Sequence, residues 1–399
     1  MSKLAHLLSI VTVYSNQQML NFTSYNPTKL HFGKGSVEKL GKEAQQFGNK
    51  ALIIIGKGSV KTNGVLNAVT QQLSSSGIEY TLYEGIKSNP VYQDADAAVQ
   101  VAKAFKADMI VAVGGGSVID TAKAVAIGYH VEHSIWDFYT RKAPVPTVGL
   151  PLLAVLTLAA TGTEQNRNSV LQNDEDGRKM GYGCEAMYPK VSFLDPEFTM
   201  SVPPNYTAYG ISDLISHTFE QYFEPTDSPL SDHIASDILK LAFEYGRKVM
   251  TNPMDYDARA NILWLSTMAL NGSLSAGKRG GDWGVHGLEH SLSVLYDIPH
   301  GAGLSIIYPA WIKAFGKDIE SKLTFLAQRT ISPSATATDF LNYLEAFFVE
   351  IQTPTRLSEA AILNTEKSRI LENFALNKVV GGFYKMDEAK HSEILEFAW

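Results

Sequence analysis

The chain of 399 residues contains a single cysteine, Cys184. One cysteine cannot form a disulfide within the chain, and it excludes a structural zinc site built from several thiolates. A protein without disulfides is typical of a reducing compartment, so we expect it in the cytoplasm. Hydrophobic runs are also short. The longest, LPLLAVLTLAA at residues 150–160, falls far below the roughly 20 residues that cross a bilayer, so we expect no membrane association.

Positive charge is in the minority as well. The sequence has 34 Lys and Arg against 41 Asp and Glu, a net charge of -7. A nucleic-acid-binding surface needs clustered basic residues to neutralise phosphates, so we expect no nucleic-acid partner. Hydrophobic residues make up 45% of the chain and charged residues 19%, which is an ordinary composition for a globular protein. The length favours two domains over one.

The pattern of the sequence changes twice along the chain. Residues 1–18 only weakly resemble a signal peptide, because no cleavage site of small residues follows, and we expect a disordered extension. From there to about residue 195, short apolar runs such as KALIIIG and DMIVAV alternate with helical stretches, which predicts a parallel sheet covered by helices on both faces. Helical patterns then follow one another without a convincing strand. We therefore expect an α/β domain at 19–198 and an all-α domain at 199–399.

Histidines gather in the second half, in two otherwise apolar helical segments. Asp213 and His217 lie four residues apart, so both side chains project from one face of their helix. His286, His290 and His300 lie close together about 70 residues later. One carboxylate and three imidazoles suffice to bind a divalent transition metal with a position left for substrate. Each residue alone could equally be a hydrogen-bonded core residue, but burying several such groups is costly unless something binds them.

A glycine-rich segment follows the strand DMIVAV directly. Gly115, Gly116 and Ser117 open the next helix, which also contains Asp120. Glycines let the backbone approach an anion closely, and the free N–H groups of a helix N-terminus favour negative charge. The segment therefore predicts a phosphate or pyrophosphate site, although a tight turn that needs positive φ would also explain part of it.

Two further loops carry groups that suit a nucleotide. Lys57, Gly58 and Ser59 follow the strand KALIIIG, where a dinucleotide-binding fold meets the adenosine ribose. This turn has no acidic residue to pair with a free 2′-hydroxyl, and Lys57 and Ser59 could bind a 2′-phosphate, which favours NADP(H) over NAD(H). Thr157 and Asn166, in LTLAATGTEQN, could hydrogen-bond a pyrophosphate or a carboxamide, but alone they indicate only a polar loop.

Five ordered motifs together resemble the iron-containing, group III alcohol dehydrogenases, and among them the branch of NADPH-dependent butanol dehydrogenases and broad-range aldehyde reductases. The motifs are FTSYNPTKLHFGKG, GGGSVIDTAKAVA, LTLAATGTEQN, GISDLISHTFEQY and HGLEHSLSVLYDIPHGAGLSI. The resemblance runs from about Phe22 to the C-terminus. It implies an architecture like that of dehydroquinate synthase, in which the α/β domain is Rossmann-like and binds a dinucleotide and the active site lies between it and the helical domain. It also implies a homodimer.

The resemblance also implies roles for individual residues. His290 would lie near the nicotinamide or the substrate as a catalytic residue, and Lys179 would reach toward the cofactor. The metal ligands would be Asp213, His217, His286 and His300, and the other cofactor-binding residues Lys57, Gly58, Ser59, Gly115, Gly116, Ser117, Asp120, Thr157 and Asn166. The ligand types suit Fe(II), Zn(II), Mn(II) or Ni(II), and the resemblance favours iron or zinc.

The expected reaction is the reversible reduction of an aldehyde to a primary alcohol by NADPH, with butanal and butanol as typical compounds. Two other enzymes on this scaffold stay open: a metal- and nicotinamide-dependent lyase of the dehydroquinate synthase type, and an NAD-dependent glycerol or polyol dehydrogenase. A protein that binds metal and nucleotide without catalysis is a further alternative, which a nicotinamide fold facing an open metal site disfavours.

Overall fold

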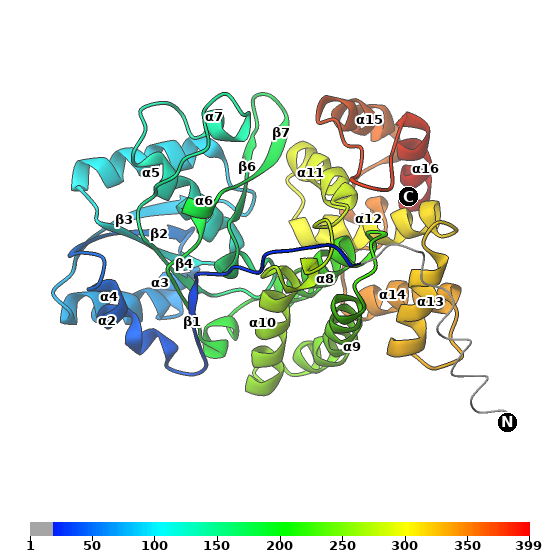
Figure 1. Cartoon of the computed structure of the whole chain (residues 1–399), viewed down its shortest axis with the longest axis horizontal. Coiled ribbons are helices and arrows are strands. Elements are labelled where there is room, and N and C mark those ends of the chain that lie inside the picture. The colour runs from blue at the N-terminus through cyan, green and yellow to red at the C-terminus, as the bar shows by residue number, and fades with distance from the viewer. Residues whose placement is uncertain (1–18) are drawn as a thin grey trace.

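The computed structural model describes residues 19–399, and the extension expected at residues 1–18 lies outside the described residues. Six parallel strands form one sheet in the order β1-β8-β5-β4-β2-β3 (Figure 1). They are β1 (Lys29–Phe32), β2 (Lys50–Gly56), β3 (Glu79–Ile86), β4 (Met109–Gly114), β5 (Leu152–Leu156) and β8 (Val191–Leu194). The predicted parallel sheet is confirmed.

Helices cover both faces of this sheet. One face carries α2 (Leu40–Ala44), α3 (Ser59–Thr62) and α4 (Val65–Ser75), and the other carries α5 (Tyr92–Phe105), α6 (Gly116–Gly128) and α7 (Trp136–Tyr139). Side chains alternate along a strand, so in β2 Leu52 and Ile54 pack into one core while Ile53 and Ile55 pack into the other. Burial on both faces explains why these strands read as continuous apolar runs.

The strand order reverses direction at β2. From β2 the chain moves outward to β3 and then returns to β4 on the other side of β2. In open α/β sheets, ligands bind at the carboxyl ends of the strands where such a reversal occurs. The turn at residues 56–59 and the glycine-rich segment at residues 114–117 both lie at this point.

An antiparallel hairpin adds to the sheet half. It consists of β6 (Asn168–Asn173) and β7 (Arg178–Gly183), which pair from Asn168 with Gly183 to Asn173 with Arg178. Strand β6 packs on α6, and β7 packs on α11 of the helical half. The sequence predicts only a polar loop at the start of this segment, because its few apolar residues give a weak alternating pattern.

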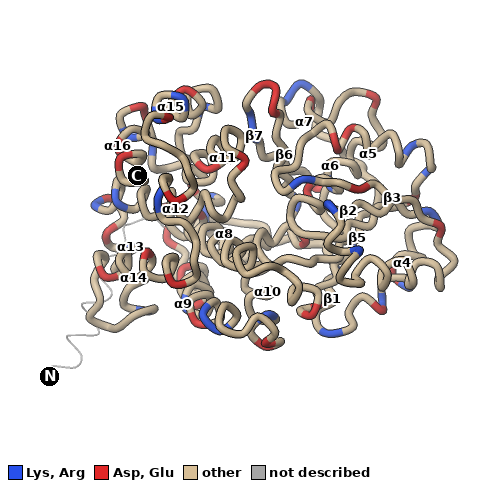
Figure 2. Tube along the Cα trace, turned by 180° about the vertical axis from the view of Figure 1, so that it is seen from behind, with Lys and Arg blue, Asp and Glu red and all other residues tan. Residues whose placement is uncertain are grey.

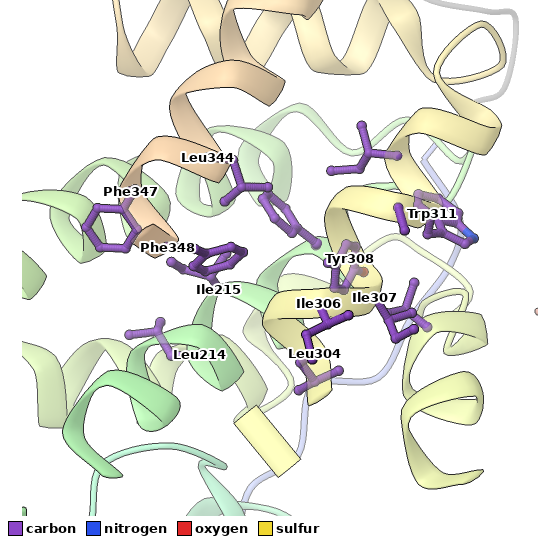
Figure 3. Close-up of a cluster of buried hydrophobic side chains, with 14 of the residues drawn as sticks. Leu214, Ile215, Leu304, Ile306, Ile307, Tyr308, Trp311, Leu344, Phe347 and Phe348 are labelled. Atoms are coloured by element: carbon purple, nitrogen blue, oxygen red, sulfur yellow. The ribbon is translucent and has the colours of Figure 1, made fainter. Parts of the chain in front are cut away.

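The rest of the described chain, after β8, contains helices and no strand. The helices are α8 (Pro204–Tyr222), α9 (Pro229–Thr251), α10 (Tyr256–Leu270), α11 (Gly284–Tyr296), α12 (His300–Phe315), α13 (Glu320–Thr330), α14 (Ala337–Glu350), α15 (Lys367–Leu376) and α16 (Glu388–Ala398). Their common core joins Ile215 of α8, Tyr308 and Trp311 of α12, and Leu344 and Phe347 of α14 (Figure 3). No helix among the described residues is long and apolar enough to cross a membrane.

The segment before β1 crosses both halves of the molecule (Figure 1). Near its start, Leu20 N donates to Gly277 O of the helical half at 3.0 Å. Near its end, Asn26 Nδ2 donates to Gln165 O of the sheet half at 2.8 Å. Lys and Arg are interspersed with Asp and Glu over both halves of the described chain (Figure 2).

Candidate active site

A cavity of about 1570 Å³ is lined by residues from both halves. The carboxyl ends of the strands contribute one wall, and α8, α11 and α12 contribute the other. The predicted site residues that line it are Lys57, Ser59, Gly115, Gly116, Ser117, Asp120, Thr157, Asn166, Lys179, Asp213, His217, His286, His290 and His300. Gly58 does not line the cavity, but its φ of 125° shapes the turn that presents Lys57 and Ser59.

Three helices bring the predicted metal ligands together. Asp213 and His217 lie one turn apart on α8, His286 is on α11, and His300 begins α12. Asp213 Oδ1 lies 3.4 Å from His217 Nδ1, 3.9 Å from His286 Nε2 and 3.7 Å from His300 Nε2. The ligand atoms of Asp213, His286 and His300 all lie within 4.8 Å of one another. The two segments that are far apart in the sequence thus converge on one carboxylate oxygen.

Three of the converging atoms are buried with no hydrogen-bond partner among residues 19–399: Asp213 Oδ1, His217 Nδ1 and His286 Nε2. Leaving a buried polar atom unpaired costs about 1–3 kcal/mol, so three of them facing one point need an explanation. Other buried atoms of the described chain, such as His391 Nε2, also lack a partner, but these three are set apart because they lie together around Asp213. A divalent cation bound by Asp213, His286 and His300 would satisfy two of these atoms, and the nitrogen and oxygen donors fit Fe(II) or Zn(II). His217 Nδ1 lies 3.4 Å from Asp213 Oδ1 but outside the set of ligand atoms that are all within 4.8 Å of one another.

Two buried glutamates that the sequence analysis missed orient these imidazoles. Glu220 Oε1 lies 2.8 Å from His286 Nδ1, and a carboxylate oxygen of Glu289 contacts His300 Nδ1. Each carboxylate holds the Nδ1 proton and leaves Nε2 directed at Asp213, as outer partners of metal-binding histidines do. The spacing in the sequence could have indicated both glutamates. Glu220 follows Asp213 by two helical turns and Glu289 follows His286 by one, so each lies on the same helix face as a predicted ligand.

The electrostatics of the cluster suit a cation. Burial lowers the pKa of His217 to about 3, despite the opposing charge of Asp213, so its imidazole is neutral, which is the form that binds metals. Burial alone would raise the pKa of Glu289, but His300 and Lys179 lower it to about 2. Burial also works to lower the pKa of His286, and Glu220 reverses this and raises it.

His290 lies beside the cluster and outside the set centred on Asp213. Its ring centroid is 5.7 Å from that of His300 and 6.5 Å from that of His286. Burial and the charge of Lys179 lower the pKa of His290 well below its usual range, so its ring is neutral near pH 7. A neutral imidazole in this cavity has one nitrogen to donate a proton and one to accept a proton.

The glycine-rich segment does not adopt the positive φ of a left-handed turn, so that alternative is wrong. The glycines instead permit close packing. A Cβ on Gly114 would lie 2.6 Å from Val118 Cγ2, and one on Gly116 would lie 2.7 Å from Thr161 Cγ2. Because α6 begins at Gly116, the unpaired N–H groups of its first turn lie at the cavity, where they can bind phosphate oxygens.

Asp120 and Asn166 are tied into a buried network around Lys123, a residue the sequence analysis missed. Lys123 Nζ donates to Thr163 Oγ1 at 2.7 Å, Asn166 Oδ1 at 3.0 Å and Asn168 O at 2.7 Å. Asp120 accepts from Thr163 Oγ1 at 2.6 Å. Burial lowers the pKa of Lys123 to about 8 and raises that of Asp120. These hydrogen bonds fix the polar loop at residues 161–168 to α6.

Lys179 connects the sheet half to the carboxylates and imidazoles around Asp213. Its Nζ donates to Asn89 Oδ1 at 2.9 Å and lies 3.9 Å from Glu289 Oε2. Asn89 in turn donates from Nδ2 to Asp297 Oδ1 at 2.8 Å, at the end of α11. Lys179 therefore lies between Asn89, in the loop after β3, and the carboxylate that contacts His300.

Comparison with known proteins gives the same family for both halves. Residues 27–196 match the family described as iron-containing alcohol dehydrogenase, and residues 207–398 match the C-terminal part of the Fe-containing alcohol dehydrogenase family. The chain is 37% identical over 386 residues to probable NADH-dependent butanol dehydrogenase 1 of Bacillus subtilis, covering 95% of this chain and 99% of that one. It is 34% identical over 349 residues to the NADPH-dependent aldehyde reductase YqhD of Escherichia coli, covering 86% and 89%.

A solved structure agrees with these sequences. The crystal structure of NADH-dependent butanol dehydrogenase A from Thermotoga maritima superposes with a TM-score of 0.93 at 37% identity, over 96% of this chain and all of that chain. The chain therefore belongs to the iron-containing alcohol dehydrogenase family and is an NAD(P)-dependent oxidoreductase. The predicted family and architecture are confirmed.

Proposed function

We propose that the protein reversibly reduces aldehydes of the butanal type to primary alcohols, with hydride supplied by NADPH. The observation that carries this is the set of buried, unpaired ligand atoms of Asp213, His217 and His286, which open into the same cavity as the first turn of α6. A metal centre and a phosphate-binding loop in one cavity bring a carbonyl and a nicotinamide together.

We assign the metal to Fe(II) or Zn(II), held by Asp213, His217, His286 and His300. Such an ion would polarise the carbonyl oxygen as a Lewis acid. Glu220 and Glu289 keep the Nε2 atoms of His286 and His300 directed at the ion by holding the protons on Nδ1. His290, neutral and at the edge of this cluster, is our candidate for transferring the proton that the alcohol product needs.

We assign the preference for NADP(H) to the turn after β2. Lys57 and Ser59 are exposed at the cavity, and residues 56–59 contain no acidic group that would repel a 2′-phosphate. Among the relatives, the butanol dehydrogenases of Bacillus subtilis are named NADH-dependent and the aldehyde reductase of Escherichia coli NADPH-dependent. The ratio of kcat/KM for NADPH to that for NADH, measured with one aldehyde, tests the assignment, and a ratio below one overturns it.

The decisive experiment is oxidation of NADPH by butanal, using protein stripped of metal and then given Fe(II) or Zn(II) separately. We expect no turnover without metal and recovery with one ion. Loss of both bound metal and turnover in Asp213→Ala and His300→Ala is also required. Tight binding of metal and cofactor without oxidation of NADPH by any aldehyde would instead favour the dehydroquinate synthase type of lyase. Preference for NAD and for glycerol would favour a polyol dehydrogenase.

We also propose a cytoplasmic homodimer with a domain division near residues 198–199. The single buried Cys184 supports a reducing compartment. Phe32 and Trp264, 41% and 44% exposed, form an aromatic contact beside the edge strand β1 and support pairing of two copies there. Light scattering after size-exclusion chromatography measures the mass, and that of a monomer would contradict the dimer.

A further inference from the structure

Trp283 has an unusual backbone conformation for so large a residue. Its φ of 59° and ψ of 12° place it in the left-handed region, at the N-terminus of α11 and three residues before His286. This region is unfavourable for bulky residues and is common only for glycine. A residue held in such a conformation beside a functional site points to a role that the rest of the fold maintains.

Two hydrogen bonds hold Trp283 in this conformation, one to the buried Glu220 and one to the backbone of the preceding loop. Its backbone N–H donates to Glu220 Oε2 at 2.5 Å, and its indole Nε1 donates to Gly280 O at 2.6 Å. The preceding loop is fixed by Glu224, which accepts from Gly281 N at 2.8 Å. The indole therefore cannot rotate freely, and Glu220 positions both this residue and the imidazole of His286.

The ring of Trp283 lies beside His286 and His217 and faces the cavity. Its centroid is 5.2 Å from that of His286 and 6.1 Å from that of His217. Trp283 remains 36% exposed and lines the cavity, so a large apolar surface is left uncovered next to polar ligands. An apolar group bound there would cover this surface, with a gain for each methylene removed from water.

We propose that Trp283 is a specificity-determining residue whose indole packs against the hydrocarbon chain of the aldehyde, and that the substrates are unbranched aliphatic aldehydes. This rests on the proposed function, since the cluster must hold the carbonyl end. A flat ring that is held by a hydrogen bond next to the ligands lets methylenes lie along its face. The same ring restricts the space for branches at the carbon attached to the carbonyl.

The size of the effect follows from the burial of methylenes. Each fully buried methylene contributes about a fourfold gain in binding, so butanal should exceed ethanal in kcat/KM by roughly 15-fold for its two extra methylenes. Trp283→Gly removes the ring surface against which the methylenes pack, and we expect the preference for butanal over ethanal to fall to about fourfold or less. Trp283→Phe keeps an aromatic face and should retain most of the preference for butanal.

The test compares the wild type, Trp283→Gly and Trp283→Phe, each loaded with the metal that supports turnover. Glycine accepts a φ of 59° without strain, so Trp283→Gly removes the indole without a backbone penalty. KM and kcat are measured for ethanal, butanal and 2,2-dimethylpropanal, and the metal content and the Kd of NADPH are measured for each variant. For Trp283→Gly we expect a higher KM for butanal, a higher kcat/KM for 2,2-dimethylpropanal, and the metal content of the wild type.

A second readout does not depend on turnover. Butanol should change the tryptophan fluorescence of the wild type and of the matched control Trp264→Phe, whose indole is exposed outside the cavity, and should not do so in Trp283→Phe. If none of the aldehydes supports oxidation of NADPH by the wild type, the proposed function fails. If the wild type oxidises NADPH with both ethanal and butanal, but Trp283→Gly keeps the wild-type ratio of kcat/KM for butanal to kcat/KM for ethanal, only the assignment of Trp283 is overturned.

Discussion

Replacing Lys123 by methionine should remove a specific pH dependence from the stability of the protein. Lys123 is fully buried, and its Nζ is enclosed by Thr163 Oγ1, Asn166 Oδ1 and Asn168 O. Burial lowers its pKa from 10.5 in the unfolded chain to about 8 in the folded protein. The folded state therefore releases the proton at a lower pH than the unfolded state does.

The sign and size of the effect follow from this difference. Between about pH 8 and 10.5 the unfolded state binds more protons than the folded state, so the contribution of Lys123 to stability rises with pH in this window. Below pH 8 the buried charge costs a constant amount of about 3 kcal/mol. From about pH 7 to about pH 9.5 the wild type should therefore gain about 2 kcal/mol relative to Lys123→Met. The packing that methionine cannot replace does not titrate, so its loss shifts the difference by a constant, and the hydrogen bond that Nζ gives up on losing a proton is already included in its pKa.

The assay is urea unfolding of both proteins at the two pH values, followed by circular dichroism and extrapolated to water. The quantity of interest is the free energy of unfolding of the wild type minus that of the variant. Lys142→Met, which removes an exposed lysine, is the control and should leave this difference constant. Parallel stability profiles for the wild type and Lys123→Met would refute the reasoning and show that the amine stays charged across the window.

Three further changes test the site and its supports. Glu220→Gln should weaken metal affinity about 10- to 100-fold in a chelator competition, because it loosens the orientation of His286, and unchanged affinity would remove Glu220 from the site. Lys57→Ala should lower the ratio of kcat/KM for NADPH to that for NADH by about tenfold, through loss of one charge-assisted hydrogen bond, and should leave the NADH reaction unaffected. Gly301→Ala would place a Cβ 2.0 Å from Tyr209 O, so urea unfolding should show a loss of about 1–3 kcal/mol, and a stability equal to that of the wild type would show that α12 can shift without cost.

Much of the fold could be predicted because its signals are local. The strands of the sheet are buried on both faces and read as apolar runs, and the glycines after β4 mark where the strand turns into α6. The hairpin β6–β7 was missed for the opposite reason. Its stability comes from packing on α6 and α11, which are distant in the sequence, and its own pattern contains few apolar residues.

The candidate site was predictable where spacing on one helix reveals a shared face, as for Asp213 and His217. The partners that support it were not, because their roles depend on where helices meet. Glu220 reads as an ordinary polar residue of α8 until α11 places His286 2.8 Å from it. Lys123 appears in the sequence as a solvated charge, and only the folded loop at residues 163–168 encloses it. Tertiary contacts decide both cases.

The segment before β1 sets a limit on how far the two halves can separate. It is bound to the helical half through Leu20, and Asn26 at its other end donates to Gln165 O of the sheet half and, at 3.4 Å, to Asn271 O of the helical half. Six residue steps of fully extended chain reach about 20 Å, so the two attachment points cannot move beyond that distance while both hydrogen bonds persist. If product leaves by a hinge motion that widens the cavity, direct hydrogen bonds between the halves, such as Thr267 to Glu164, must break first. This tether then sets an upper limit on the opening, beyond which one of its ends must detach.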